Sequence, residues 1–387
     1  MLDINYYRFA EEKAKNSIPT WLISKKYNLE VFEKEGFPVR LNNIQQLKQI
    51  FNTMQENRFN IYMKELKGFS KKDTDIFIDA LKKSIAFQKN FFPRRDLILP
   101  LDTLIAFFVI YKKLHALNPN AKTILEIGPG SGYSSFFLNK FKLLENYTYT
   151  DACESFYMLQ NYINFFMFKE DFVQHAIEDE DNRIYLHNEI ISYEKSGIEK
   201  DICIKYENSH STQYHAYPWW RLKDLAQNDI MYDLVTSNAN LLEFSEGALN
   251  DYFSIIKQKL SHGGMFFVHC PGYNLIRDFE YIIEKLYEFK LAIVFYAKWT
   301  VEYNCKQTNK KLEKRFRVPN IVIVNDGHDL FESFYGKKDI MPFMPSGKEE
   351  IDSVFLPNSD YYHERTVYTK EDIKNILLKK DNRYEEI

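Results

Sequence analysis

TILEIGPGSGYSS, residues 123–135, is the stretch that decides the fold. Its first five residues are mostly apolar and predict a buried strand, after which Gly128, Gly130 and Gly132 occupy alternate positions. Glycine lets a backbone turn sharply and approach a ligand where a Cβ atom would collide. A helix that starts after such a loop also offers free N–H groups to the ligand. The stretch therefore predicts a strand, a ligand-binding loop and the beginning of a helix.

The spacing of the glycines separates this loop from two other nucleotide-binding loops. A dinucleotide-binding GxGxxG motif needs its third glycine at position 133, which is Tyr133, and the Gly-Lys pair of a P-loop is missing. Asp151, in YTYTDACES, follows Gly128 by 23 residues. A carboxylate at the end of the second strand can accept hydrogen bonds from ribose hydroxyls. The loop and Asp151 together predict a site for a nucleoside-containing ligand.

Outside the loop, short apolar runs alternate with helical runs. The expected strands are 123–127, 147–150, 233–237 and 265–269, and the expected helices are 101–117, 133–144, a helix carrying Leu159 to Phe166, and one carrying Leu249 to Leu260. This alternation is typical of a parallel sheet covered by helices, so we predict a Rossmann-like α/β fold. Two later apolar runs, 291–297 and 321–324, are expected to form an antiparallel pair at the sheet edge.

The chain divides into three predicted parts. Residues 1–98 form a helical N-terminal region, since 45–67 carry apolar residues at helical spacing. Residues 99–327 form the α/β domain, after a proline-bearing junction. Residues 328–387 form a C-terminal extension that ends in a short helix near 370–379. Whether this extension packs over the domain or mediates assembly, for instance of a homodimer, is open at this stage.

Charge and cysteine content narrow the class of protein. The net charge of −3 provides no global positive field, so a nucleic-acid partner is not expected. The four cysteines are scattered, which favours a reducing compartment. The longest apolar stretch, 97–111, contains Pro100 and Asp102 and is too short to span a bilayer. With no secretory signal at the start, we expect a soluble, cytoplasmic enzyme with a small-molecule or saccharide substrate.

The EIGPGSG loop, Asp151 and the stretch YDLVTSN (232–238) resemble successive motifs of class I S-adenosylmethionine-dependent methyltransferases. The resemblance covers roughly residues 100–325. It implies that the cofactor, S-adenosyl-L-methionine, lies across the carboxyl ends of the strands. It also implies that the glycines lie beside the methionine portion and Asp151 binds the ribose. Glu126 would orient the loop or contact the amino-acid group through water.

A narrower resemblance concerns the acceptor. YTDACESFYMLQNYI (149–163) is similar to a stretch of the sugar O-methyltransferase family, as are NANLLEF (238–244) and LNDYF (249–253). Ala152-Cys153-Glu154 stands where that family has Leu-Pro-Glu. The resemblance implies methylation of a sugar hydroxyl, on a nucleotide sugar or in surface polysaccharide biosynthesis.

Methyl transfer from a sulfonium is a direct displacement, and a hydroxyl acceptor needs a base. The candidate bases near the ends of the later strands are His215, His269 and Glu243, with His210 as a further histidine in the same region. Each histidine taken singly is more often a structural residue than a catalytic one. Among them His215 is slightly better placed, because Tyr217, Trp219 and Trp220 beside it could stack against a sugar ring or close over the cofactor. The sequence does not decide which residue is the base.

The candidate substrate-binding residues are the tryptophan pair and two asparagines. Trp219 and Trp220 could stack against a sugar ring or belong to the core, while Asn238 and Asn240 could bind hydroxyls or simply form a turn. Asp224, Asp229 and Asp233 have the pattern of solvated positions, so we predict no metal. The basic run 306–317 could steer an anionic substrate or be a solvated connection.

Two other functions stay open. One is N-methylation of a small amine or amino sugar, although 238–240 (Asn-Ala-Asn) lacks the NPPY pattern of many N-methylating enzymes. The other is a catalytically inactive methyltransferase fold that serves as a scaffold or binding subunit. An intact cofactor loop predicts cofactor binding but does not by itself predict turnover.

Overall fold

The structure is a computed structural model that describes residues 2–17, 38–51, 58–92, 97–176, 212–270, 272, 279–300, 317–336 and 365–380. His210 and residues 306–316 of the basic run lie outside the described residues.

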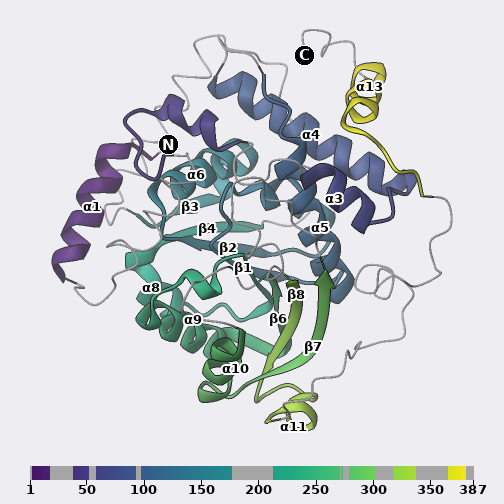
Figure 1. The fold of residues 1–387 in the computed structure, drawn as a ribbon. Coiled ribbons are helices and arrows are strands. Elements are labelled where there is room, and N and C mark those ends of the chain that lie inside the picture. The colour runs from purple at the N-terminus through teal and green to yellow at the C-terminus, as the bar shows by residue number, and fades with distance from the viewer. Residues whose placement is uncertain are drawn as a thin grey trace, which may run out of the picture.

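An eight-stranded sheet forms the centre of the molecule (Figure 1). The strands are β1 (Thr123–Ile127), β2 (Asn146–Asp151), β3 (Phe172–Gln174), β4 (Gln213–Pro218), β5 (Tyr232–Asn238), β6 (Leu260–His269), β7 (Leu291–Thr300) and β8 (Arg317–Asn325). Their order is β3-β4-β2-β1-β5-β6-β8-β7. The first six strands of that order are parallel, and β8 pairs antiparallel with both β6 and β7. The antiparallel pair at the sheet edge is therefore confirmed.

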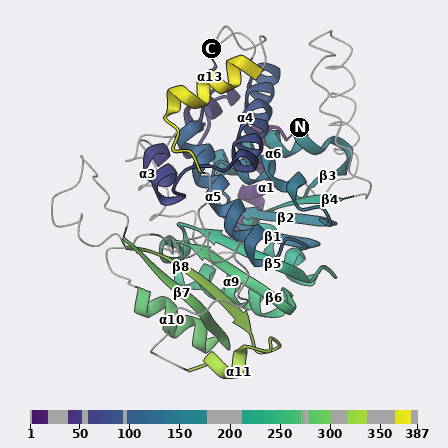
Figure 2. The same ribbon diagram turned by 90° about the vertical axis from the view of Figure 1, so that its right-hand side faces the viewer.

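Helices cover both faces of the sheet. The α-helices are α1 (Ile4–Ser17), α3 (Arg58–Glu65), α4 (Lys71–Phe91), α5 (Leu101–Leu117), α6 (Glu154–Phe168), α8 (Leu222–Gln227), α9 (Glu246–Lys259), α10 (Phe279–Glu288), α11 (Phe331–Phe334) and α13 (Lys370–Lys380). The 3₁₀ helices are η2 (Ile44–Ile50), η3 (Tyr133–Phe136), η4 (Leu138–Lys140), η5 (Lys169–Asp171), η6 (Trp219–Arg221) and η7 (Leu241–Glu243). Figures 1 and 2 show α3, α4, α5 and α6 on one side of the sheet and α9 and α10 on the other. The predicted Rossmann-like α/β sheet flanked by helices is confirmed.

Two predicted elements differ from the structure, one in its type and one in its first residue. Residues 133–144 do not form an α-helix but the two short 3₁₀ helices η3 and η4. Residues 131–138 are all buried, whereas a surface helix buries one stripe and exposes the opposite face. The segment is thus enclosed on every side, and its serine and aromatic residues are weak helix formers. The strand expected at 265–269 begins earlier, at Leu260, because the Gly263-Gly264 pair lies within β6 beside a register shift.

The direction in which the sheet is built reverses at β1. The chain passes from β1 to β2 on one side and later returns to β5 on the other side of β1. Open α/β sheets bind ligands outside the carboxyl ends of the strands at such a reversal. At that edge Ile127, the last residue of β1, is in register with Thr150 and Ser237, the next-to-last residues of β2 and β5.

Both terminal regions pack onto the α/β domain. One buried apolar core includes Leu2 and Tyr7 near the N-terminus and Ile373 and Leu377 in α13. α13 lies beside α4 (Figure 2), and Lys370 at its start forms an ion pair with Asp102 of α5. The C-terminal helix is thereby attached to the N-terminal half of the chain. Among the described helices, none combines the length and the apolar character that a bilayer span requires.

Candidate active site

The three glycines of the loop have similar backbones and different surroundings. Gly128, Gly130 and Gly132 have φ of 64°, 58° and 72°, in the left-handed region. A Cβ on Gly128 would lie 2.2 Å from Asn240 Nδ2, and one on Gly132 would lie 2.6 Å from Gln160 Cγ. A Cβ on Gly130 would meet nothing within 4 Å. Gly128 and Gly132 therefore allow close packing within the protein, while Gly130 faces the open space where a ligand can approach.

Asp151 lies beside that open position, at the carboxyl end of β2. Its Oδ1 accepts a hydrogen bond from the Cys153 amide (2.9 Å), and its Oδ2 accepts one from Gln160 Nε2 (2.7 Å). Burial raises the pKa of Asp151 to about 6, although the amides of Cys153 and Gly130 and the side chain of Gln160 act in the opposite direction. The carboxylate is thus oriented before any ligand arrives and titrates close to neutral pH.

Glu126 supports the loop from within the protein. Its two carboxylate oxygens accept hydrogen bonds from Ser134 Oγ (2.9 Å) and Tyr147 OH (2.6 Å). Burial raises its pKa to about 7, against these two hydrogen bonds, and the nearby Asp151 adds to the rise. Of the two roles implied for Glu126, these contacts match that of orienting the loop, since Ser134 lies in the first turn after it.

The two asparagines after β5 hold strand ends together. Asn240 Nδ2 donates to the carbonyl oxygens of Ile127 (2.9 Å) and Gly128 (3.4 Å), and Asn240 Oδ1 accepts a hydrogen bond from Ser237 Oγ. Asn238 Oδ1 accepts from the His269 amide (3.2 Å), which ties β5 to β6. Their side chains join the glycine loop to the later strands, so substrate binding by either residue remains a prediction.

His269 ends β6 and is surrounded by buried polar groups from three other elements. Its Nδ1 lies 2.7 Å from Asn320 Oδ1, and its Nε2 lies 3.3 Å from Tyr62 OH. Because a carboxamide oxygen only accepts hydrogen bonds, we assign the imidazole proton to Nδ1, which leaves Nε2 as a proton acceptor. Lys113 Nζ lies 3.1 Å from the same Asn320 oxygen and 3.4 Å from Nδ1.

Electrostatics keep this imidazole neutral. Burial lowers the pKa of His269 well below its usual value, and the charges of Lys113 and Arg58 lower it further, against the hydrogen bond to Asn320. A neutral imidazole whose Nε2 can accept a proton is the form that a general base requires. The geometry therefore gives His269 the chemistry of a base at neutral pH.

The backbone beside His269 is strained. Ala239 and Cys270, the residues after β5 and β6, have φ of 60° and 66°, and the Ala239 amide donates to the Cys270 carbonyl at 2.8 Å. Non-glycine residues in this region are uncommon, and such strain gathers at functional sites. Glu243 is close enough for its charge to raise the pKa of Cys270, after the larger effect of burial. The ends of β5 and β6 thus bring Glu243 and His269 to one edge.

His215 lies elsewhere. It is the third residue of β4, about 10 Å along the strand from the carboxyl end at Pro218. Its Nδ1 lies 3.1 Å from His175 Nε2, and the His175 ring stacks on Tyr217 with 4.1 Å between centroids. These contacts describe a packed pair of histidines towards the sheet edge, and they favour His269 over His215 as the base.

The tryptophan pair packs against the N-terminal helix. Trp219 and Trp220 are both buried. Trp219 Nε1 donates to Glu11 at 3.4 Å, and Trp220 meets the Tyr7 ring edge-on with centroids 4.9 Å apart. Both tryptophans thus contact α1, so the pair forms part of the surface on which that helix packs. Stacking on a sugar remains a prediction.

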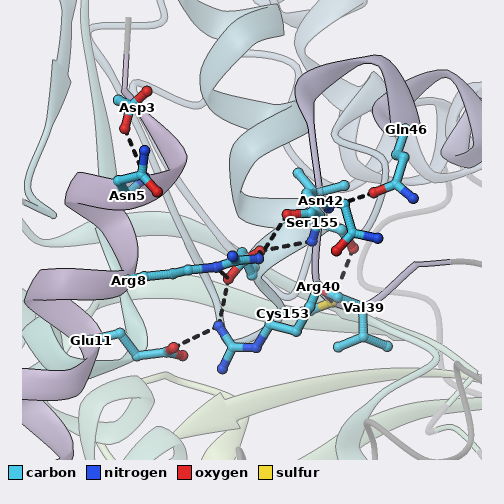
Figure 3. Close-up of polar contacts among 12 residues, drawn as sticks. Asp3, Asn5, Arg8, Glu11, Val39, Arg40, Asn42, Gln46, Cys153 and Ser155 are labelled. Carbon is cyan, nitrogen blue, oxygen red and sulfur yellow. Dashed lines mark hydrogen bonds and ion pairs between the residues drawn. The ribbon is translucent and has the colours of Figure 1, made fainter.

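An ion-pair network fixes the N-terminal region to α6, three residues beyond Asp151. Figure 3 shows Arg8 and Arg40 directed to the same place, with Glu11 beside Arg40. Both arginines reach Glu154, at 2.7 Å from Arg8 and 2.6 Å from Arg40, and the Leu41 amide donates to it at 2.9 Å. Burial would raise the pKa of Glu154, but these hydrogen bonds outweigh it and lower the pKa.

The acidic residues considered as metal ligands have other partners. Asp233 accepts hydrogen bonds from the amides of Lys122 and Thr123, and Asp224 pairs with Arg221. Within the described part of the chain, no group of three or more His, Cys, Asp or Glu side chains is arranged to hold a metal ion.

The structure adds four residues that the sequence reasoning did not single out. They are Gln160, which contacts the glycine loop and Asp151, and Tyr62, Lys113 and Asn320, which surround His269. Gln160 follows Asp151 by nine residues on an adjoining helix, so its spacing was a usable signal. The other three lie between 51 and 207 residues from His269, and no local pattern could have found them.

No protein-family model matches the chain, and no curated protein sequence matches it. Similar solved structures include ribosomal protein L11 methylase from Lactobacillus delbrueckii subsp. bulgaricus, at 13% identity and a TM-score of 0.30, covering 56% of this chain and 76% of that one. A TehB-like SAM-dependent methyltransferase from Corynebacterium glutamicum is 13% identical, with a TM-score of 0.32 and coverage of 56% and 87%. Magnesium protoporphyrin IX methyltransferase from Synechocystis PCC 6803 is 10% identical, with a TM-score of 0.32 and coverage of 65% and 99%. Identities and TM-scores this low assign no activity, so function is inferred from the site itself.

Proposed function

We propose that the chain is an S-adenosylmethionine-dependent O-methyltransferase that acts on a sugar hydroxyl. The observation that carries the proposal is the arrangement at one sheet edge. The open face of Gly130 lies beside the buried carboxylate of Asp151, and a neutral His269 ends a strand on the other side of β1. A cofactor site and a proton acceptor are thus offered on the same edge.

The residues present fit the cofactor. Gly130 has room where a side chain would stand, and Asp151 can accept hydrogen bonds from ribose hydroxyls. When bound, S-adenosylmethionine would supply an electrophilic methyl group on a sulfonium. Glu126 would act indirectly, by holding Ser134 and with it the turn that follows the loop.

The acceptor oxygen must lose its proton as it attacks the methyl carbon. A bound S-adenosylmethionine would supply the methyl group and keep the electron pair of the carbon–sulfur bond on its sulfur, so the one proton released by the hydroxyl has to be taken up by the protein or solvent. We propose that it passes to His269 Nε2 through the Tyr62 hydroxyl, which already lies 3.3 Å from that nitrogen. The hydrogen bond between His269 Nδ1 and Asn320 would stabilise the imidazolium formed.

The choice of a saccharide rests on the sequence resemblance, and the choice of oxygen also rests on the base. An amine acceptor that arrives unprotonated needs no base before it attacks, whereas a hydroxyl does. His269 with its lowered pKa supports a hydroxyl acceptor. Nucleotide sugars in the cytoplasm are the substrates to try first.

The test begins with calorimetric titration of S-adenosylhomocysteine into the full-length protein, comparing wild type with Asp151→Ala. We expect one-to-one binding that weakens about 10- to 100-fold in the variant, the effect of losing hydrogen bonds to a charged group. Methyl transfer to a panel of nucleotide sugars is then compared for wild type, His269→Gln and His215→Gln. Loss of a base typically slows transfer about 100-fold or more, and we expect that loss for His269→Gln only. Absence of binding in the wild type would refute the cofactor assignment, and transfer to amines alone would refute the hydroxyl acceptor.

A further inference from the structure

Gln160 connects three parts of the proposed cofactor site. It lies on α6 and is fully buried. Its Nε2 donates to the carbonyl oxygen of Gly130 at 2.5 Å and to Asp151 Oδ2 at 2.7 Å. One amide group thereby joins the loop after β1, the end of β2 and the helix that follows it.

The amide cannot turn around without losing both contacts. The Gly130 carbonyl and the Asp151 carboxylate are acceptors, so only the NH₂ side of Gln160 can face them. The stem of the side chain is also confined, because Gln160 Cγ occupies the space next to Gly132 that a Cβ would need. The position of the NH₂ group is therefore determined from both ends of the side chain.

The other end of the amide has no partner. Gln160 Oε1 is buried and accepts no hydrogen bond from any residue that the structure describes. A buried acceptor without a partner is unfavourable, and an apolar side chain of the same length would remove that penalty. The same amide therefore combines an unfavourable buried oxygen with two hydrogen bonds from Nε2. This combination indicates that the two hydrogen bonds have a role beyond the packing of α6.

We propose that Gln160 is a positioning residue of the cofactor site, which holds the Asp151 carboxylate and the Gly130 carbonyl in the orientation that receives the nucleoside. The inference rests on the proposed function. To that function the inference adds a residue that acts through Asp151 rather than on the reacting atoms. The NH₂ group neutralises part of the carboxylate charge without adding a full positive charge that would compete with ribose hydroxyls.

Asp151 needs such a donor because it is buried among groups that disfavour its charge. Its pKa is raised to about 6 by burial, and the hydrogen bond from Gln160 is one of the contacts that limit the rise. Among the described residues, the titratable groups that interact with its charge include Glu126 of β1, Tyr149 of β2, Cys153 just before α6, Tyr157 of α6 and Tyr252 of α9. None of these supplies a positive charge. Removing the Gln160 donor is therefore expected to raise the pKa of Asp151 further.

The experiment measures S-adenosylhomocysteine binding by calorimetry as a function of pH. Gln160→Met keeps the length of the side chain and removes the donor. We expect about tenfold weaker binding at about pH 8, as for one lost hydrogen bond to a charged group. We also expect the pH below which binding is lost to move upward from its wild-type position near 6. The matched control is Asn161→Leu, because the Asn161 amide is also buried on α6 and, among the described residues, its hydrogen bonds go to Tyr157 of the same helix and not to the glycine loop or Asp151.

A second variant separates positioning from packing. In Gln160→Glu the introduced carboxyl must carry a proton before it can donate to Asp151, so binding is expected to improve as the pH is lowered from about 8 to about 6. Wild-type binding changes in the opposite direction over that range. Equal affinity and an unchanged pH profile in both Gln160 variants would overturn the inference while leaving the cofactor assignment intact. Failure of the wild type to bind would instead refute the proposed function.

Discussion

Replacing Gly132 with alanine is expected to destabilise the protein by about 2 to 5 kcal/mol. The φ of Gly132 is 72°, and the left-handed conformation costs a residue with a Cβ about 1 to 2 kcal/mol. The new Cβ would also lie 2.6 Å from Gln160 Cγ and 3.3 Å from Gln160 Cα. Relieving an overlap of this kind in a packed interior costs about 1 to 3 kcal/mol more, and the Cα cannot move away without shifting α6.

The matched control is Gly130→Ala in the same loop. Its φ of 58° carries the same backbone penalty, but the new Cβ meets nothing within 4 Å, so we expect a loss of only about 1 to 2 kcal/mol. Urea unfolding of wild type and both variants, followed by circular dichroism, measures the difference from the transition midpoints. Equal losses in the two variants would refute the close packing of Gly132 on Gln160. Gly130→Ala should instead weaken S-adenosylhomocysteine binding, since its Cβ points into the open side of the loop.

Two further predictions concern charged groups. Because the folded-state pKa of Glu154 is lowered, its ion pairs stabilise the protein above the ordinary value of 4.5 and this stability is lost as the pH falls through the folded-state pKa. Thermal unfolding followed from about pH 7 to well below pH 4.5 should therefore show that Glu154→Gln is destabilised by roughly 2 to 4 kcal/mol at neutral pH and less at the acid end, unlike Glu145→Gln at an exposed ion pair. Lys113→Met should raise the pKa of His269, because Lys113 is the largest cause of its lowering after burial. The acid limb of the methyl-transfer pH profile would then move to higher pH. Lys112→Met removes a partner of Asp73 instead and should leave the limb in place. If the limb does not move in Lys113→Met, His269 is excluded as the titrating base.

The sequence predicted the loop and the sheet because both depend on local patterns. Apolar runs of strand length, alternating with helical periodicity, are sufficient for a covered parallel sheet, and the spacing of Gly128, Gly130 and Gly132 is sufficient for a loop with left-handed backbone. The helix expected at 133–144 failed for a related reason. Periodicity assumes one buried face, and residues 131–138 are enclosed by tertiary contacts on all sides.

Side-chain roles depend on contacts that the sequence does not reveal. Trp219 and Trp220 have the character of ligand-stacking residues but pack against Tyr7 and Glu11 of α1. The sequence does not decide between His215 and His269 as the base. They differ in the structure because β4 carries His215 away from its carboxyl end, whereas β6 ends at His269.

By itself, then, the sequence determined the α/β class, the position of the glycine loop and the placement of Asp151 at the end of the second strand, since these follow from backbone conformation and spacing within about thirty residues. Only the tertiary structure decided which titratable groups face one another. Tyr62 and Lys113 meet His269 across 207 and 156 residues of chain, and Arg8 meets Glu154 across 146. Their pKa values and hydrogen bonds follow from burial and from neighbours brought together by packing, and those neighbours exist only once the chain has folded.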